Sequence, residues 1–170
     1  MVKILYMLIG PKGSGKTYIG TLVEKKTDIS FLRVENIWLT LNSKEDGWLK
    51  VEQTIDKAFE SCNKLMIENL GAGQGFHRFY VSLKVKYNIK LVRVFSDLDV
   101  CLDRVMSREN KNHIPVSDTK VAEYNKIAAQ VKLDWAIEIN NNGPASDAEI
   151  LEAINSLQQK KLNQCKRPRR

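Results

Sequence analysis

Residues 10–17 read Gly-Pro-Lys-Gly-Ser-Gly-Lys-Thr, which matches the pattern Gly-x-x-x-x-Gly-Lys-Ser/Thr without a gap. In such a loop the glycines let successive backbone N–H groups turn inward and hold phosphates at the positive end of the following helix. The lysine at its end reaches the β- and γ-phosphates, and the hydroxyl that follows ligates Mg²⁺. The loop is therefore predicted to bind a nucleotide through Gly10, Lys12, Gly13, Ser14, Gly15, Lys16 and Thr17.

The elements that must position this loop alternate between short apolar runs and segments of helical period. The runs expected to be strands are Ile4–Ile9, Ser30–Val34, Leu65–Glu68, Lys90–Phe95 and Trp135–Ile139. Their nearly continuous apolar character is typical of parallel strands covered on both faces. Five strands separated by helices predict a three-layer α/β/α fold with a five-stranded parallel sheet.

Helices between these runs are indicated by periodicity and by their first residues. The clearest apolar face combines Trp48, Val51, Ile55, Ala58, Phe59 and Cys62 at helical spacing. Ser96 with Asp99, and Ser146 with Glu149, have the spacing of a capping box and predict the starts of two later helices.

The length, the phosphate loop at residue 10 and the order of the elements resemble those of the small P-loop kinases. This group includes shikimate, gluconate, nucleoside-monophosphate and polynucleotide 5′-hydroxyl kinases, and the resemblance covers roughly residues 1 to 158. It implies the P-loop nucleoside triphosphate hydrolase fold, ATP and Mg²⁺ as cofactors, and transfer of the γ-phosphoryl to a hydroxyl or phosphate of a small metabolite or nucleotide. Residues 1–159 are expected to form one kinase domain, with a lid over residues 105–116 that closes to exclude water.

On the acceptor side, Glu35 matches the position where similar kinases place an acidic residue, commonly Asp, that faces the acceptor hydroxyl. Glu68 ends an apolar run, and a carboxylate at the end of such a strand beside a P-loop can hold Mg²⁺ or contact the acceptor. Gly71 and Gly73 permit close backbone approach to an acceptor, as in the Gly-rich acceptor loop of shikimate kinases; the alternative is a flexible turn. Arg78 could bind an anionic group.

The nucleotide side is predicted from the segment that resembles the passage into the lid. Arg104 and Arg108 lie at i and i+4 and so share one helix face. In similar enzymes the first packs near the adenine and the second clamps the transferring phosphoryl group, although both could instead be surface residues. Asn141 lies in an Asn/Gly-rich turn at the family position beside the adenine base. The Phe-Arg pair that shikimate kinases use is replaced by Leu49-Lys50, which disfavours shikimate as substrate.

Two other functions remain open. A polynucleotide 5′-hydroxyl kinase would use the same chemistry on RNA or DNA ends. An ATP-hydrolysing switch module without an acceptor is disfavoured, because the chain lacks an Asp-x-x-Gly switch, an Asn-Lys-x-Asp motif and an Asp-Glu pair after the third apolar run.

Composition and charge restrict the setting. The chain has 170 residues and a net charge of +7, of which the tail 160–170 carries +6 with no acidic residue. The tail is expected to be a solvated end that can contact nucleic acid, and the body is nearly neutral. Three separated cysteines and the absence of a signal-like or membrane-spanning apolar run predict a cytoplasmic protein without disulfides or zinc. The acceptor and the oligomeric state are not determined by the sequence.

Overall fold

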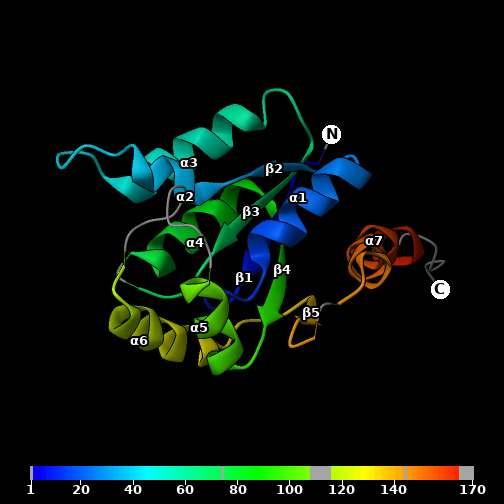
Figure 1. Ribbon diagram of the computed structural model, residues 1–170. Coiled ribbons are helices and arrows are strands. Elements are labelled where there is room, and N and C mark those ends of the chain that lie inside the picture. The colour runs from blue at the N-terminus through cyan, green and yellow to red at the C-terminus, as the bar shows by residue number, and fades with distance from the viewer. Residues whose placement is uncertain (1, 74, 108–115, 144, 165–170) are drawn as a thin grey trace.

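The apolar runs of the sequence form the central sheet of the protein (Figure 1). The computed structural model describes residues 2–73, 75–107, 116–143 and 145–164. All strands of the sheet are parallel, in the order β2-β3-β1-β4-β5, so the predicted α/β fold with a five-stranded parallel sheet is confirmed. The strands are β1 (Ile4–Ile9), β2 (Ser30–Leu32), β3 (Lys64–Asn69), β4 (Asn88–Phe95) and β5 (Ile137–Asn140).

Helices cover both faces of the sheet. Successive residues of a strand point to opposite faces, and because they are apolar on both, each face needs a covering layer. Leu5 and Met7 pack on one face with residues of α3 and α4, and Tyr6 and Leu8 pack on the other with residues of α1 and α7. The described helices are α1 (Lys16–Lys26), α2 (Val34–Leu39), α3 (Gly47–Ala58), α4 (Phe76–Lys86), α5 (Leu98–Met106), α6 (Asp118–Ala129) and α7 (Asp147–Gln164).

Some local predictions were wrong; the fifth strand, for example, begins at Ile137 and not at Trp135. The second strand ends at Leu32, and the apolar Val34, predicted as its last residue, instead begins α2 and is buried against the core. Ser96 does not cap α5, because its hydroxyl donates a 2.8 Å hydrogen bond to the Asn141 carbonyl and Asp97 is the N-cap.

The other predicted helix start is confirmed. The Ser146 N–H donates to Glu149 Oε2 at 2.9 Å, and the Glu149 N–H donates to Ser146 Oγ at 3.3 Å, which is a reciprocal capping box at the start of α7. This helix continues to Gln164, past the domain boundary predicted at residue 159. Among the helices that the structure describes, none has the length and apolar character needed to cross a lipid bilayer.

The topology brings the loops that follow the strands to one edge of the sheet. β1 lies in the middle of the order, with β3 and β2 on one side and β4 and β5 on the other. Segments far apart in sequence therefore meet around the loop that follows β1, at the carboxyl edge where parallel sheets bind their ligands.

Candidate active site

The phosphate loop connects β1 to α1 and has a conformation that its glycines allow. Gly13 and Gly15 have φ angles of 86° and 96°, in the left-handed region that side chains other than glycine rarely adopt. A Cβ on Gly13 would also lie 2.1 Å from the Cys101 carbonyl oxygen. Gly15 is the N-cap of α1, so the unpaired N–H groups at the start of that helix are next to the loop. The local sequence thus builds a helix start suited to an anion.

Asn125 of α6 holds the loop through two hydrogen bonds to one residue. The Lys12 N–H donates to Asn125 Oδ1 at 2.7 Å, and Asn125 Nδ2 donates to the Lys12 carbonyl at 2.9 Å. Asn125 is 1% exposed, so this pairing satisfies an amide that burial would otherwise penalise. The contact joins two residues 113 positions apart and ties α6 to the phosphate loop.

The next two carbonyls of the loop each accept a hydrogen bond from a side chain, one on α5 and one in the turn after β5. Arg104 Nη1 donates to the Gly13 carbonyl at 3.4 Å and lies 3.2 Å from Ser96 Oγ. Asn141 Nδ2 donates to the Ser14 carbonyl at 2.8 Å. Three side chains from separate segments therefore fix three successive peptide groups of the loop.

Lys16 is buried within the site and is held by the loop itself. Its ammonium donates hydrogen bonds to the carbonyls of Gly10 and Pro11, at 2.7 and 2.6 Å. Burial lowers the pKa of Lys16 to about 8, and the nearby carboxylate of Glu68 acts in the opposite direction. The side chain is a cation placed where the phosphates of a nucleotide are predicted to bind.

Thr17 and Glu68 form a pair that suits a divalent cation. Thr17 Oγ1 donates a 2.6 Å hydrogen bond to Glu68 Oε2. Glu68 is 7% exposed, and its other oxygen, Oε1, accepts no hydrogen bond from any described residue. Mg²⁺ in kinase sites uses one or two carboxylates, a hydroxyl, water and the substrate phosphates. These two residues therefore fit Mg²⁺, whereas no group of three or more His, Cys, Asp or Glu within the described ranges could hold a metal.

Glu35 lies in the first turn of α2 between two basic side chains. Its Oε1 is 3.7 Å from Lys12 Nζ, and its Oε2 accepts a 3.3 Å hydrogen bond from Arg33 Nη2. Arg33 Nε is also 3.9 Å from Glu68 Oε1, so the guanidinium lies between the two carboxylates. Arg33 follows β2 and Glu68 lies in β3, and the parallel pairing of these neighbouring strands brings the charged groups together.

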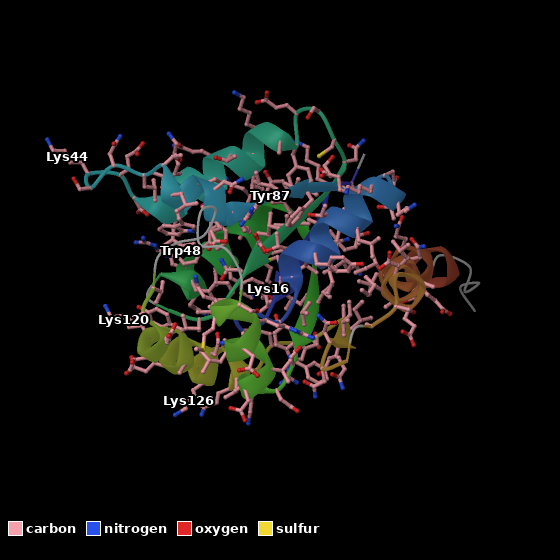
Figure 2. All side chains as sticks on the ribbon, in the orientation of Figure 1. Lys16, Lys44, Trp48, Tyr87, Lys120 and Lys126 are labelled. Atoms are coloured by element: carbon pink, nitrogen blue, oxygen red, sulfur yellow. The ribbon has the colours of Figure 1, made fainter. Side chains whose placement is uncertain are left out.

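One cavity of about 610 Å³ connects the phosphate loop with the charged groups at Arg33, Glu35 and Glu68. This volume is in the range of small-molecule sites. Figure 2 labels Lys16 near the centre of the view and Trp48, a residue of α3, to its upper left. The cavity is lined by Lys12, Gly13, Gly15, Lys16, Thr17, Tyr18, Arg33, Val34, Glu35, Trp38, Trp48, Glu68, Asn69, Leu70, Ala72 and Arg104.

Solved structures with a similar fold include small kinases. A sugar kinase from Janibacter sp. HTCC2649 has a TM-score of 0.62 at 16% identity, over 95% of each chain. The gluconokinase from Sinorhizobium meliloti 1021 has a TM-score of 0.62 at 13% identity, over 98% of each chain. The shikimate kinase from Acinetobacter baumannii has a TM-score of 0.58 at 16% identity, over 98% of this chain and 97% of its own. The chain has the same fold as these small kinases.

No protein-family model matches the sequence, and no curated protein is significantly similar to it. At identities of 13% and 16% the likeness to these kinases establishes the fold, and the expected resemblance is confirmed at that level.

Within the P-loop kinase fold, not every predicted residue lies at the cavity. Arg78 is exposed and pairs with Asp46 Oδ2 at 3.5 Å, outside the cavity lining. Gly71 and Gly73 do not line it either, although Ala72 between them does. Arg108 and most of the predicted lid 105–116 lie outside the described residues.

Several residues at the site were not predicted, among them Arg33, Trp38, Trp48 and Asn125. Arg33 stands directly after an apolar run and two residues before Glu35, which was a usable signal for a charged group at the sheet edge. Trp48 was assigned only to an apolar helix face, but it also lines the cavity. Asn125 had no local signal, because only the folded chain brings it to the phosphate loop.

Proposed function

We propose that this protein is an ATP-dependent phosphotransferase that moves the γ-phosphoryl of ATP to a hydroxyl or phosphate oxygen of a small acceptor. The observation that carries the proposal is the continuity of one cavity, which runs from Lys16 and Thr17 of the phosphate loop to Glu35 on α2. A hydrolysing module needs only the first half of such a cavity. A phosphotransferase also needs room for the acceptor beside the nucleotide phosphates, and a carboxylate there can take the proton of an acceptor hydroxyl.

Each residue around the cavity has a separate role in the proposed phosphoryl transfer. The hydroxyl oxygen of the acceptor attacks the γ-phosphorus and forms a new P–O bond, while the bond from that phosphorus to the β–γ bridging oxygen breaks and ADP leaves. The hydroxyl proton passes to the Glu35 carboxylate, which acts as general base. Lys16 stabilises the charge that is spread over the phosphoryl oxygens. Mg²⁺, held by Thr17 and Glu68, would neutralise charge on the β- and γ-phosphates.

The nucleotide base belongs on the side of β4 and β5 in this proposal. Arg104 lines the cavity and donates a hydrogen bond to the Gly13 carbonyl. It can therefore contact the nucleotide and hold the phosphate loop at the same time. Asn141 acts on the loop from the same side, through the Ser14 carbonyl. Arg108, which lies outside the described residues, stays predicted to clamp the transferring phosphoryl group.

The proposal is tested by measuring ADP release with ATP and Mg²⁺ in the presence of hydroxyl compounds from several classes. These are sugars, hydroxy acids, nucleosides, nucleoside monophosphates and 5′-hydroxyl oligonucleotides. Stimulation by one class above basal hydrolysis, lost in Lys16→Ala, is the expected result. Stimulation by oligonucleotides alone would favour a polynucleotide kinase, and equal turnover with every compound and with none would contradict a phosphotransferase.

A further inference from the structure

The part of the cavity beyond the phosphate loop is walled by apolar and aromatic side chains. Trp38 of α2 and Trp48 of α3 line it together with three smaller apolar residues, Val34, Leu70 and Ala72, beside the polar groups around Glu35. α2 and α3 follow β2 in the chain, so this wall lies on the side of the sheet edge opposite to β4 and β5. The compartment that faces Glu35 is therefore built to contact an apolar surface of the acceptor.

The two indole rings are held firmly by their neighbours. Their centroids are 5.2 Å apart with an interplanar angle of 83°, an edge-to-face arrangement. Trp48 also packs on Phe79, with centroids 4.8 Å apart. Glycines make room for both rings: a Cβ on Gly47 would lie 2.0 Å from Trp38, and a Cβ on Gly75 would lie 2.7 Å from Trp48. Rings fixed in this way offer a stacking surface that loses little conformational freedom when a ligand binds.

The charges of the compartment do not favour an anionic acceptor. Beside Glu35 and Glu68, the compartment is lined by two basic side chains, Lys12 and Arg33. Lys12 lies 3.7 Å from Glu35, and Arg33 lies 3.3 Å from Glu35 and 3.9 Å from Glu68. Both cations are thus already paired with carboxylates of the protein, so the charges around Glu35 balance and leave no net positive charge for a carboxylate on the acceptor. Arg78, the cation predicted to bind such a group, is 79% exposed and pairs with Asp46 instead.

We propose that the acceptor is a neutral alcohol that carries a flat aromatic or heteroaromatic ring close to its hydroxyl. The ring lies against Trp38 and Trp48, and the hydroxyl is directed to Glu35. This inference rests on the proposed phosphotransfer and specifies its substrate class. It separates this chain from the hydroxy acids, shikimate and gluconate, that two of the similar structures are named for.

Binding can be followed without relying on activity, because the sequence contains three tryptophans and two of them line the compartment. Trp135→Phe removes the third, which does not line this cavity. In this variant, with the nucleotide side filled by a non-hydrolysable ATP analogue and Mg²⁺, tryptophan fluorescence is titrated with matched pairs. The pairs are uridine against ribose and phenyl glucoside against glucose, with gluconate and shikimate as hydroxy acids.

At least one ring-bearing compound is expected to quench the fluorescence and to bind about tenfold or more tightly than its ring-free partner, which corresponds to 1.4 kcal/mol. Trp38→Leu in the same background should reduce that preference, and Trp38→Phe, which keeps an aromatic face, should retain most of it. Ring-free partners or hydroxy acids that bind as tightly as every ring-bearing compound would overturn the inference, as would an unchanged preference in a folded Trp38→Leu.

Transfer from γ-labelled ATP, measured with the same compounds, separates this inference from the proposed function. Phosphorylation of gluconate or shikimate, with none of the ring-bearing alcohols, overturns the inference and leaves the phosphotransfer intact. Ring-dependent binding with no label in any compound contradicts the phosphotransfer and leaves the ring-binding compartment intact.

Discussion

The Thr17 hydroxyl donates a 2.6 Å hydrogen bond to Glu68 Oε2, which joins the first turn of α1 to the carboxyl end of β3. β3 pairs directly with β1, so the phosphate loop that follows β1 and the carboxylate on β3 are brought together by the sheet itself. A hydroxyl and a buried carboxylate at this distance share one small polar site. This pair is the reason for assigning Mg²⁺ to Thr17 and Glu68.

Glu68→Gln tests that assignment, because it removes the negative charge while keeping an oxygen that can accept from Thr17. We expect the Mg²⁺ concentration needed for half-maximal nucleotide binding to rise by roughly 10- to 100-fold, the range seen when groups around a metal are altered. Nucleotide binding without Mg²⁺ should change little. Titration of a fluorescent ATP analogue measures both, with Thr17→Ser as a control that keeps the hydroxyl. An unchanged Mg²⁺ requirement in Glu68→Gln contradicts the assignment.

The lowered pKa of Lys16 predicts how nucleotide binding depends on pH. Burial holds this pKa at about 8 in the free protein, and bound phosphates, being anionic, raise it. Binding therefore takes up a proton above pH 8, and affinity should fall by up to about tenfold per pH unit as the pH rises further. Calorimetric titration between neutral and alkaline pH tests this slope. Lys16→Arg, which stays charged, should bind with a flatter profile; identical slopes in the two proteins would rule out the titration of Lys16 as the cause.

The Asn125–Lys12 pair predicts a link between α6 and nucleotide affinity. Asn125→Leu leaves a buried N–H and a carbonyl without their partners, which should lower the free energy of unfolding by about 1–3 kcal/mol. Because the unpaired peptide belongs to the phosphate loop, the KM for ATP should also rise, more than kcat falls. Denaturant unfolding and steady-state kinetics measure the two effects. Asn155→Leu, at an exposed position on α7, is the matched control. Loss of stability with an unchanged KM would make Asn125 a purely structural residue.

The general-base role of Glu35 is tested by Glu35→Gln. The amide cannot take the proton of the acceptor hydroxyl, so kcat for transfer should fall by about 10²- to 10⁴-fold. ATP affinity should stay close to that of the native protein, because the phosphates are held by the loop. Glu60→Gln makes the same charge change at an exposed position outside the cavity and should have no effect. Equal losses of transfer and of ATP binding in Glu35→Gln would assign the residue to the phosphate loop instead.

The sequence alone was enough to place residues at the cavity where they form one continuous motif or follow an apolar run. The phosphate loop is a single run of eight residues, and Glu68, singled out because it ends an apolar run of the sequence, lies in β3 and lines the cavity. Arg78 could not be placed, because the sequence does not determine which way the first turn of α4 faces. Asn125 and Trp48 could not be assigned to the site, because their contacts depend on how α6 and α3 pack against the rest of the fold.

The most direct test of the central claim is the fate of the γ-phosphoryl in water enriched in ¹⁸O. The protein is incubated with ATP, Mg²⁺ and the acceptor that best stimulates ADP release, and the products are examined by mass spectrometry. Transfer to an acceptor predicts a phosphorylated acceptor without ¹⁸O, formed in equal amount to ADP and absent in Lys16→Ala. Inorganic phosphate carrying ¹⁸O as the sole phosphorylated product would contradict the phosphotransferase and identify a hydrolase.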